Sequence, residues 1–196
     1  MKPGLLIAVA RHGQTDSNVK GLWVGNGDDP LNETGKEQAR RLAKSLTSYN
    51  FDFIVSSDKR RSIQTAEIVS GAIGVPFYGQ RKDLRDRDYG AMEGLTTDQI
   101  RERYGVEMKS LSKEIDDLGA SETVASVLKR VKEFADIVRN NFDGKKIIVI
   151  THGAFIRSFY EMYVHESDNL RFTNCSHFIV RLLEGETELV EDLQTI

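Results

Sequence analysis

The chain has 196 residues, of which 39% are hydrophobic and 29% are charged, a balance typical of a globular protein with one hydrophobic core. Its formal net charge of -3 argues against general binding of nucleic acids or membranes, which calls for a basic excess. The single cysteine, Cys175, excludes a disulfide within the chain, and no cysteine and histidine spacing is typical of a zinc site. We therefore predict a single domain over residues 1–196, a reducing compartment, no metal, no nucleic-acid partner and no membrane partner.

The first predicted element is a strand in the apolar run from Gly4 to Ala10. This run is too short to cross a membrane, and it lacks the small-residue cleavage pattern of a signal peptide. We therefore expect a cytoplasmic protein.

A helix is predicted within residues 31–50, where Thr34 followed by Glu37 has the spacing of a capping box. The apolar residues of this segment recur on one helical face: Ala39, Leu42, Ala43 and Leu46. Residues 51–57 then predict a short apolar strand.

A second helix is predicted after that strand, with Ser57 as its N-cap and with its end near Gly71. Arg60 and Arg61 then lie in its first turn, where the positive end of the helix dipole disfavours a cation. Backbone donors at a helix start, together with guanidinium groups, suit a phosphate group. We therefore expect an anion to bind there.

The rest of the chain continues to alternate between strands and helices. Strands are predicted within residues 75–80 and 145–151, helices within 96–105, 121–142 and 153–163, and two closing strands around a turn at Gly185 and Glu186. This alternation predicts an α/β fold, a three-layer α/β/α sandwich with a mostly parallel central sheet.

Two of the predicted strands end alike, with His12 and Gly13 after the first and with His152 and Gly153 after the later one. Ligands of α/β sheets bind beyond the carboxyl ends of the strands. Glycine allows a ligand or another backbone to approach closely, and histidine suits nucleophilic or proton-transfer chemistry near neutral pH. Together with Arg11, the repeated pattern predicts a functional site. The histidines outside this pattern are interpreted as surface or packing residues: His165 and His177.

The segment ARHGQTDSN, from Ala10 to Asn18, resembles the Arg-His-Gly motif of the histidine phosphatase superfamily, also called the phosphoglycerate mutase-like family. Four later segments resemble further motifs of this family in the same order. GDDPLNETGKEQA is similar to its Asp-x-Pro-Leu-Thr-x-x-Gly segment, SDKRRSIQTA to its Ser-Asp-Leu-x-Arg-Ala-x-Gln-Thr-Ala helix, LRDRDYGAMEGL to its Leu-x-Glu-x-x-Tyr/Phe-Gly-x-x-Glu-Gly segment, and THGAFIR to its second His-Gly motif. Because five blocks occur in family order, the resemblance is specific, and it implies a phosphoglycerate mutase-like fold.

The resemblance also implies a mechanism in which His12 attacks phosphorus and forms a phosphohistidine that water hydrolyses. Arg11, Arg61 and His152 would surround the transferred group and stabilise its charge, so that no metal or other cofactor is needed. Gly13 would fix the orientation of the His12 ring and leave the other ring nitrogen free to attack.

The departing alcohol needs a proton, and alignment on Tyr89 and Gly90 puts Asp86 where the family usually has glutamate. Asp86 is therefore the candidate acid and base. Aspartate is one methylene shorter than glutamate, and a misplacement of about 1 Å can cost on the order of 100-fold in rate. Three other carboxyl groups stay open as donors: Asp83, Asp88 and Glu93.

The substrate-binding residues are predicted partly from the resemblance and partly from their place in loops near the site. This set consists of Gly13, Asn18, Trp23, Tyr89, Gly153 and Ala154. Four further residues are expected to border the pocket: Lys20, Met92, Lys109 and Glu122. Their types favour a small phosphorylated metabolite over a large inositol polyphosphate, which would call for more cations.

We predict a phosphatase that acts on phosphomonoesters. A cofactor-dependent phosphoglycerate mutase is the rival enzyme, but residues 95–121 lack the longer mutase insertion with its paired arginines, and Ala154 stands where mutases usually carry asparagine. The third hypothesis is a non-catalytic protein that binds a phosphoryl ligand and in which Asp86 has lost the acid function. The sequence leaves both a monomer and a homodimer open.

Overall fold

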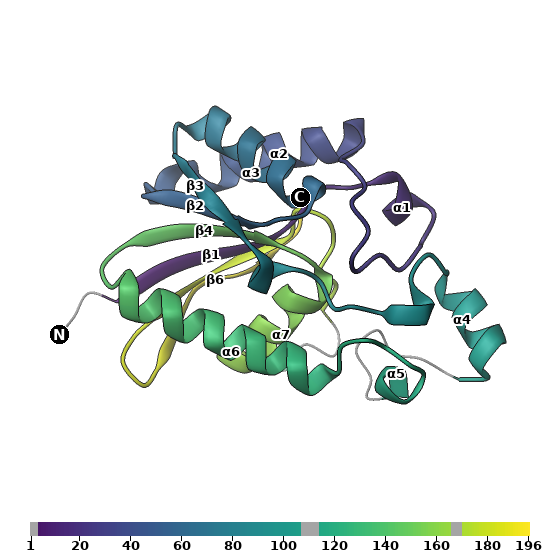
Figure 1. The fold of residues 1–196 in the computed structure, drawn as a ribbon. Helices are drawn as coiled ribbons and strands as arrows, with labels where there is room; N and C mark the ends of the chain where they lie inside the picture. The colour runs from purple at the N-terminus through teal and green to yellow at the C-terminus, as the bar shows by residue number, and fades with distance from the viewer. Residues whose placement is uncertain (1–3, 107–113, 166–169) are drawn as a thin grey trace.

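The computed structural model describes residues 4–106, 114–165 and 170–196 (Figure 1). Its strands are β1 (Leu5–Arg11), β2 (Phe53–Ser57), β3 (Phe77–Arg81), β4 (Lys146–Thr151), β5 (His177–Leu182) and β6 (Thr187–Gln194). Its helices are α1 (Asp16–Val19), α2 (Glu33–Leu46), α3 (Arg60–Ile73), α4 (Thr97–Tyr104), α5 (Glu114–Asp117), α6 (Val124–Asn141) and α7 (Gly153–Tyr163), with 3₁₀ turns η1 (Thr47–Tyr49), η2 (Lys82–Leu84) and η3 (Gly90–Met92). Every predicted strand and helix is present, and the short helices α1 and α5 are additional.

The six strands form one sheet in the order β3-β2-β4-β1-β5-β6. Neighbouring strands from β3 to β1 pair in parallel, whereas β5 and β6 each pair antiparallel with the preceding strand of the sheet. The predicted mostly parallel α/β sandwich is therefore confirmed. Because β1 and β4 are adjacent, with Arg11 opposite Thr151, the histidines that follow them leave the sheet side by side.

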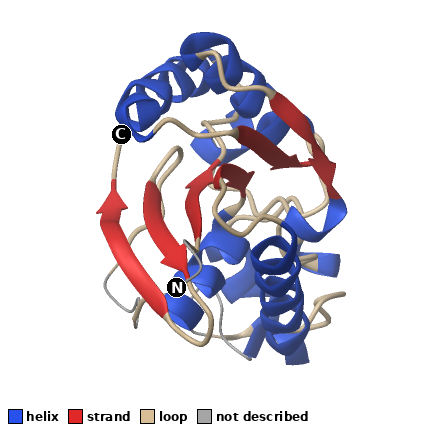
Figure 2. Cartoon of the chain, turned by 90° about the vertical axis from the view of Figure 1, so that its left-hand side faces the viewer, coloured by secondary structure: helices blue, strands red, loops and turns tan. Residues whose placement is uncertain are grey.

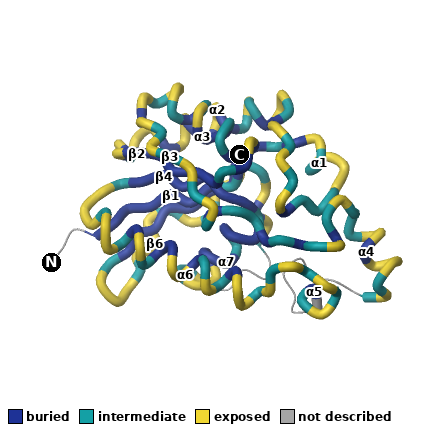
Figure 3. The backbone as a smooth tube through the Cα atoms, in the orientation of Figure 1, coloured by how far each residue is buried: buried dark blue, intermediate teal, exposed yellow. Residues whose placement is uncertain are grey.

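Helices α2 and α3 cover one face of the sheet, and α6 and α7 cover the other (Figures 1 and 2). Side chains of a strand point alternately to the two faces. In β1, Ile7 packs in the core with α6 and α7, whereas Ala8 packs in the core with α2 and α3. Because both faces are covered, the central strands are buried along nearly their whole length (Figure 3).

A smaller apolar cluster lies apart from the two core layers, in the segment that includes α4 and α5. Its buried members are Tyr89, Met92, Ile100 and Ile115. In Figure 1 these helices lie beyond the right-hand end of the sheet, where the parallel strands end. This segment supplies one wall of the cavity described below. Within the described residues, no helix is both long enough and apolar enough to span a membrane.

The predicted cap of the first long helix is wrong. The N-cap of α2 is Asn32, whose side chain accepts a hydrogen bond from the Gly35 amide, and Thr34 lies inside the first turn. Asparagine is as strong an N-cap as serine or aspartate, and Asn32 has the extended backbone that the cap position requires. The helix therefore begins two residues before the position that the capping-box pattern indicates.

Both predicted ends of the second long helix are also wrong. The N-cap of α3 is Lys59 rather than Ser57, and the helix ends at Gly74 rather than near Gly71. Gly74 has the left-handed φ of 71° that favours glycine after a helix, whereas Gly71 is an ordinary helical residue. Arg60 and Arg61 nevertheless occupy the first turn of α3, as predicted.

Candidate active site

A cavity of about 250 Å³ opens at the carboxyl ends of β1 and β4. It is lined by residues that follow these strands, by the N-terminal parts of α3 and α7, and by residues in or near α1 and α4. The lining consists of Arg11, His12, Thr15, Asn18, Leu22, Trp23, Val24, Asp29, Arg61, Asp86, Tyr89, Thr97, Gly153, Ala154, Arg157 and Phe172. The structure thus brings most of the predicted site residues into one place.

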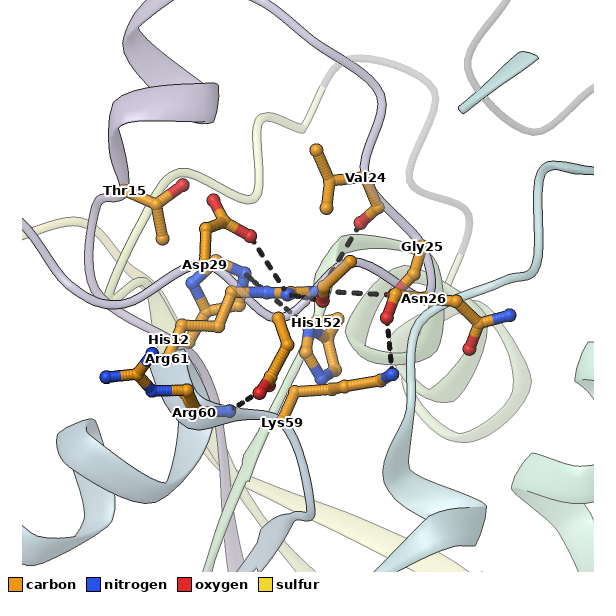
Figure 4. Close-up of polar contacts among 12 residues, drawn as sticks. His12, Thr15, Val24, Gly25, Asn26, Asp29, Lys59, Arg60, Arg61 and His152 are labelled. Atoms are coloured by element: carbon orange, nitrogen blue, oxygen red, sulfur yellow. Dashed lines mark hydrogen bonds and ion pairs between the residues drawn. The ribbon is translucent and has the colours of Figure 1, made fainter. Parts of the chain in front are cut away.

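His12 is held in a single tautomer by its own backbone. Its Nδ1 lies 2.7 Å from the carbonyl oxygen of Gly13, which only accepts hydrogen bonds, so Nδ1 carries the proton. The other nitrogen, Nε2, is then unprotonated, and its lone pair accepts from the Nε–H of Arg61 at 3.2 Å (Figure 4). Burial lowers the pKa of His12 well below 6.5, and the nearby Arg61 and Arg11 add to the shift. The ring is therefore neutral at pH 7.

Gly13 is required for close backbone packing. A Cβ at this position would lie 2.4 Å from the carbonyl oxygen of Gly35, in the first turn of α2. The amide of Gly13 donates to Thr65 Oγ1 at 3.0 Å, which ties the loop to α3. Gly13 thus fixes the position of the carbonyl group that orients His12, although it is not itself part of the described cavity lining.

His152 has a partner at each ring nitrogen. Its Nδ1 accepts a hydrogen bond from Arg61 Nε at 3.2 Å, and its Nε2 lies 3.2 Å from Ser62 Oγ. The ring is buried and its centroid lies 5.0 Å from that of His12 in an edge-to-face arrangement. Burial, reinforced by Arg61, lowers the pKa of His152 well below 6.5, so this histidine is also neutral at pH 7.

Three arginines belong to the described lining of the cavity, and two of them, Arg61 and Arg11, lie near His12. Arg61 is 2% exposed and its Nε–H lies between the two histidines (Figure 4). Arg11 donates from Nη1 to the carbonyl oxygen of Phe172 at 2.7 Å, whereas its buried Nε has no partner among the described residues. A buried donor without a partner is unfavourable, and an anionic ligand would satisfy it. A Cβ at Gly153 would lie 3.8 Å from this nitrogen, so the glycine leaves room beside it.

Asp86 lies in the cavity lining, where the resemblance predicts the acid. Its Oδ1 accepts hydrogen bonds from the amides of Ala154 at 2.9 Å and Arg87 at 3.0 Å. Burial raises the pKa of Asp86 above the ordinary 3.8, although these amides and the nearby arginines partly oppose the shift. A carboxyl group with a raised pKa beside a cavity lined by arginines is suited to proton transfer.

The alternative donors have other partners. Asp83 pairs with Arg81, Asp88 accepts from Asn26 Nδ2 at 2.7 Å, and Glu93 accepts from the Asn26 amide at 2.8 Å. Within the described residues, the cavity lining includes none of these three carboxyl groups. The geometry therefore favours Asp86.

The predicted substrate-binding residues are only partly brought together. The cavity lining contains Asn18, Trp23, Tyr89, Gly153 and Ala154. The expected pocket-border residues Lys20, Met92 and Glu122 lie outside the described lining, and Lys109 lies outside the described residues. As predicted, the two remaining histidines lie elsewhere: His177 is buried in β5, and His165 is exposed.

Several lining residues have no role in the sequence analysis: Thr15, Leu22, Val24, Asp29, Thr97, Arg157 and Phe172. Only Arg157 carries a local signal, because it is four residues after Gly153 and shares its helical face. The others reach the cavity through tertiary folding. Within the described residues, no three histidine, cysteine, aspartate or glutamate side chains gather as ligands for a metal ion.

Comparison with known proteins agrees with this geometry. The family model for the histidine phosphatase superfamily (branch 1) matches residues 7–192. Phosphoglycerate mutase-like protein 4 of Arabidopsis thaliana is 30% identical over 92% of this chain and 80% of its own length. A protein named uncharacterized phosphatase PhoE, of Bacillus subtilis (strain 168), is 30% identical over 78% of this chain and 74% of its own. The crystal structure of phosphoglycerate mutase from Bacillus anthracis str. Sterne matches with a TM-score of 0.84 and 26% identity, over 97% of this chain and 93% of that one.

Proposed function

Because this chain belongs to the histidine phosphatase superfamily (branch 1), we propose that it hydrolyses phosphomonoesters through a phosphohistidine on His12. The observation that carries the proposal is the hydrogen bond from His12 Nδ1 to the Gly13 carbonyl oxygen, at 2.7 Å. This bond leaves the lone pair of Nε2 at the cavity, next to Arg61. A neutral imidazole that is protonated at Nδ1 and unprotonated at Nε2 is the form that attacks phosphorus through Nε2.

In the first step, His12 Nε2 forms a bond to phosphorus while the bond from phosphorus to the ester oxygen breaks. Asp86 gives its proton to that oxygen, and an alcohol leaves. In the second step, water attacks phosphorus and passes a proton to Asp86. The bond from nitrogen to phosphorus breaks, its electron pair returns to Nε2, and inorganic phosphate is released.

Charge on the transferred group is stabilised by fixed donors. Arg11 offers its Nε, which has no partner among the described residues, and the Nε–H of Arg61 lies between His12 and His152, which holds it by accepting at Nδ1. Phosphoryl transfer depends mainly on positioning and on stabilising the charge on the equatorial oxygens. We propose that these side chains supply the stabilisation without a metal ion.

The substrate is proposed to be a small phosphorylated metabolite, since the cavity volume is about 250 Å³. Trp23 and Tyr89 pack edge to face with centroids 4.8 Å apart and form an aromatic part of the cavity lining. Phosphoglycerate mutase is the second candidate function, and the names of two relatives favour it. Ala154, which places an amide on Asp86 but no polar side chain in the cavity, favours the phosphatase.

The test is phosphate release from a panel of phosphomonoesters in EDTA. The panel includes 3-phosphoglycerate with and without 2,3-bisphosphoglycerate, and 2-phosphoglycerate is followed in the same samples. Phosphate release without isomerisation is expected. Isomerisation that depends on the bisphosphate would make the protein a mutase, and turnover that stops in EDTA would refute the metal-free mechanism.

A further inference from the structure

Every nitrogen of the Arg61 guanidinium already donates to an acceptor in the protein (Figure 4). Besides the contacts of Nε with the two histidines, Nη1 donates to the Gly27 carbonyl oxygen at 2.7 Å and lies 3.4 Å from Asp29 Oδ1. Nη2 donates to the carbonyl oxygens of Val24 at 3.3 Å and Gly25 at 3.2 Å. A phosphoryl oxygen that binds Arg61 therefore has to displace one of these acceptors.

The carbonyl acceptors are difficult to displace, because the loop of residues 24–29 is anchored on several sides. Lys59 Nζ donates to the Asn26 carbonyl oxygen, and Glu93 Oε1 accepts from the Asn26 amide at 2.8 Å. Asp28 Oδ1 accepts from the first amide of α3 at 2.8 Å. Movement of the loop backbone would break these bonds together.

Asp29 is the acceptor that costs least to displace. Its contact with Arg61 is the longest of the set, and it is made by a side chain that can rotate. Its other oxygen, Oδ2, is buried and has no hydrogen-bond partner among the described residues, although Asp29 lines the cavity and its side chain is 22% exposed. Such an oxygen is poorly satisfied where it lies. Asp29 also carries a negative charge at a site that would receive a phosphoryl dianion.

The charge at position 29 is a property of this chain rather than of the motif. In the Asp-x-Pro-Leu segment, Asp28 is the specified aspartate and Asp29 occupies the open position. The first amide of α3 donates to Asp28 and not to Asp29, so the start of this helix does not depend on the Asp29 carboxylate. The structural role of the motif therefore leaves the Asp29 carboxylate unexplained.

We infer that Asp29 sets the affinity of the site for phosphate, because its carboxylate competes with the phosphoryl group for Arg61 Nη1. This inference rests on the proposed function, since both concern the same phosphoryl site. Competition from Asp29 lowers the affinity of the site for the product, inorganic phosphate. A phosphatase has to release that product in every cycle, whereas a mutase has to keep the phosphoryl group on the enzyme.

The test is calorimetric titration of the intact protein with inorganic phosphate, for the wild type, Asp29→Asn and Asp29→Ser. Both variants remove the charge, and both are expected to bind phosphate about three- to tenfold more tightly, as for loss of one partly exposed competing ion pair. The matched control is Glu33→Gln. It removes the same negative charge, but Glu33 lies four residues after Asp29 and its side chain is 87% exposed. Its affinity is expected to equal that of the wild type.

Unchanged or weaker phosphate affinity in both Asp29 variants would overturn the inference, and so would an equal gain in Glu33→Gln, because net charge would then explain the effect. Calorimetry needs no turnover, so the two proposals fail separately. Equal affinities with normal ester hydrolysis would overturn only the competition. Tighter binding in the variants, without hydrolysis of any ester by the wild type, would support the competition and contradict the phosphatase.

Discussion

The two strand ends that carry a histidine and a glycine look alike in sequence but differ in hydrogen bonding. After β1, His12 donates from Nδ1 to the carbonyl of its own neighbour, Gly13, and its Nε2 is left with a lone pair. After β4, His152 accepts at Nδ1 from Arg61 and has Ser62 at Nε2. Both rings thus accept from Arg61 Nε, but their other nitrogens differ: that of His12 donates to a backbone carbonyl oxygen, whereas that of His152 contacts the Ser62 hydroxyl.

The difference follows from the path of the chain after each glycine. Gly13 continues into a loop that packs against Gly35, so its carbonyl group can turn back to the imidazole. Gly153 starts α7 directly, and His152 becomes the N-cap residue of that helix. In the proposed mechanism, the partner of Nδ1 distinguishes the nucleophilic histidine from the other one, and that partner depends on tertiary structure rather than on the motif.

The largest effect is expected from removing each histidine in turn. His12→Ala is expected to lower kcat by about 10⁴-fold or more, because the nucleophile is lost. His152→Ala is expected to lower kcat by about 10²–10³-fold, because it loses only a group that stabilises the transferred phosphoryl. Steady-state kinetics with an aryl phosphate measures both, with circular dichroism as a control for folding. Equal losses in the two variants would contradict the assigned difference.

Asp86→Asn is expected to slow alkyl phosphates by about 10²–10⁴-fold and aryl phosphates much less, since an aryl alcohol leaves without a proton. Comparison of kcat for the two substrate classes gives the result directly. If both classes lose the same factor, the proton comes from another group.

The pH dependence of turnover gives a second test of Asp86 as the proton donor. Asp86 donates only while protonated, and its pKa is raised above 3.8, so the protonated fraction falls as pH rises through that higher value. His12 attacks only while neutral. Because its pKa is lowered well below 6.5, it stays neutral at pH values at which an ordinary histidine is already protonated. The ratio of alkyl to aryl turnover should therefore increase as pH falls. A ratio that varies with pH in Asp86→Asn as it does in the wild type would contradict the assignment.

Substitution of the two glycines, Gly13 and Gly153, should change the stability of the protein by different amounts. Gly13→Ala places a Cβ 2.4 Å from the Gly35 carbonyl oxygen and is expected to destabilise the protein by about 1–3 kcal/mol. In Gly153→Ala, the nearest side-chain atom lies 3.8 Å from the new Cβ, and the change should stay within about 0.5 kcal/mol. Urea denaturation measures both, and equal destabilisation would show that the two strand ends are packed alike.

The smallest effect is expected from substitution of Ser62, whose side chain contacts the His152 ring. Ser62→Ala removes one hydrogen bond to His152 Nε2, a loss of about 1 kcal/mol or roughly fivefold in kcat. The phosphoryl group should still form on His12. Loss of phosphohistidine in this variant would mean that His152 does more than stabilise charge.

The sequence predicts the order of strands and helices along the chain, because the spacing of apolar residues in each segment indicates which of its faces is buried. The motifs also predict a site made of Arg11, His12, Arg61, Asp86 and His152, and the structure brings these residues close together, which leaves their proposed roles to the experiments above. The sequence misses the caps at Asn32 and Lys59, because several nearby residues could cap and packing selects one. It also misses Asp29 and Phe172, since each approaches the arginines only when distant segments fold together.

The most direct test of the account is to locate the phosphoryl group on the enzyme. The protein is mixed with an aryl phosphate, quenched under alkaline conditions that preserve phosphohistidine, digested and analysed by mass spectrometry, alongside His12→Ala and His152→Ala. The account predicts phosphate on His12 in the wild type and in His152→Ala, and none in His12→Ala. Phosphate on His152, or turnover that persists in His12→Ala, would contradict it.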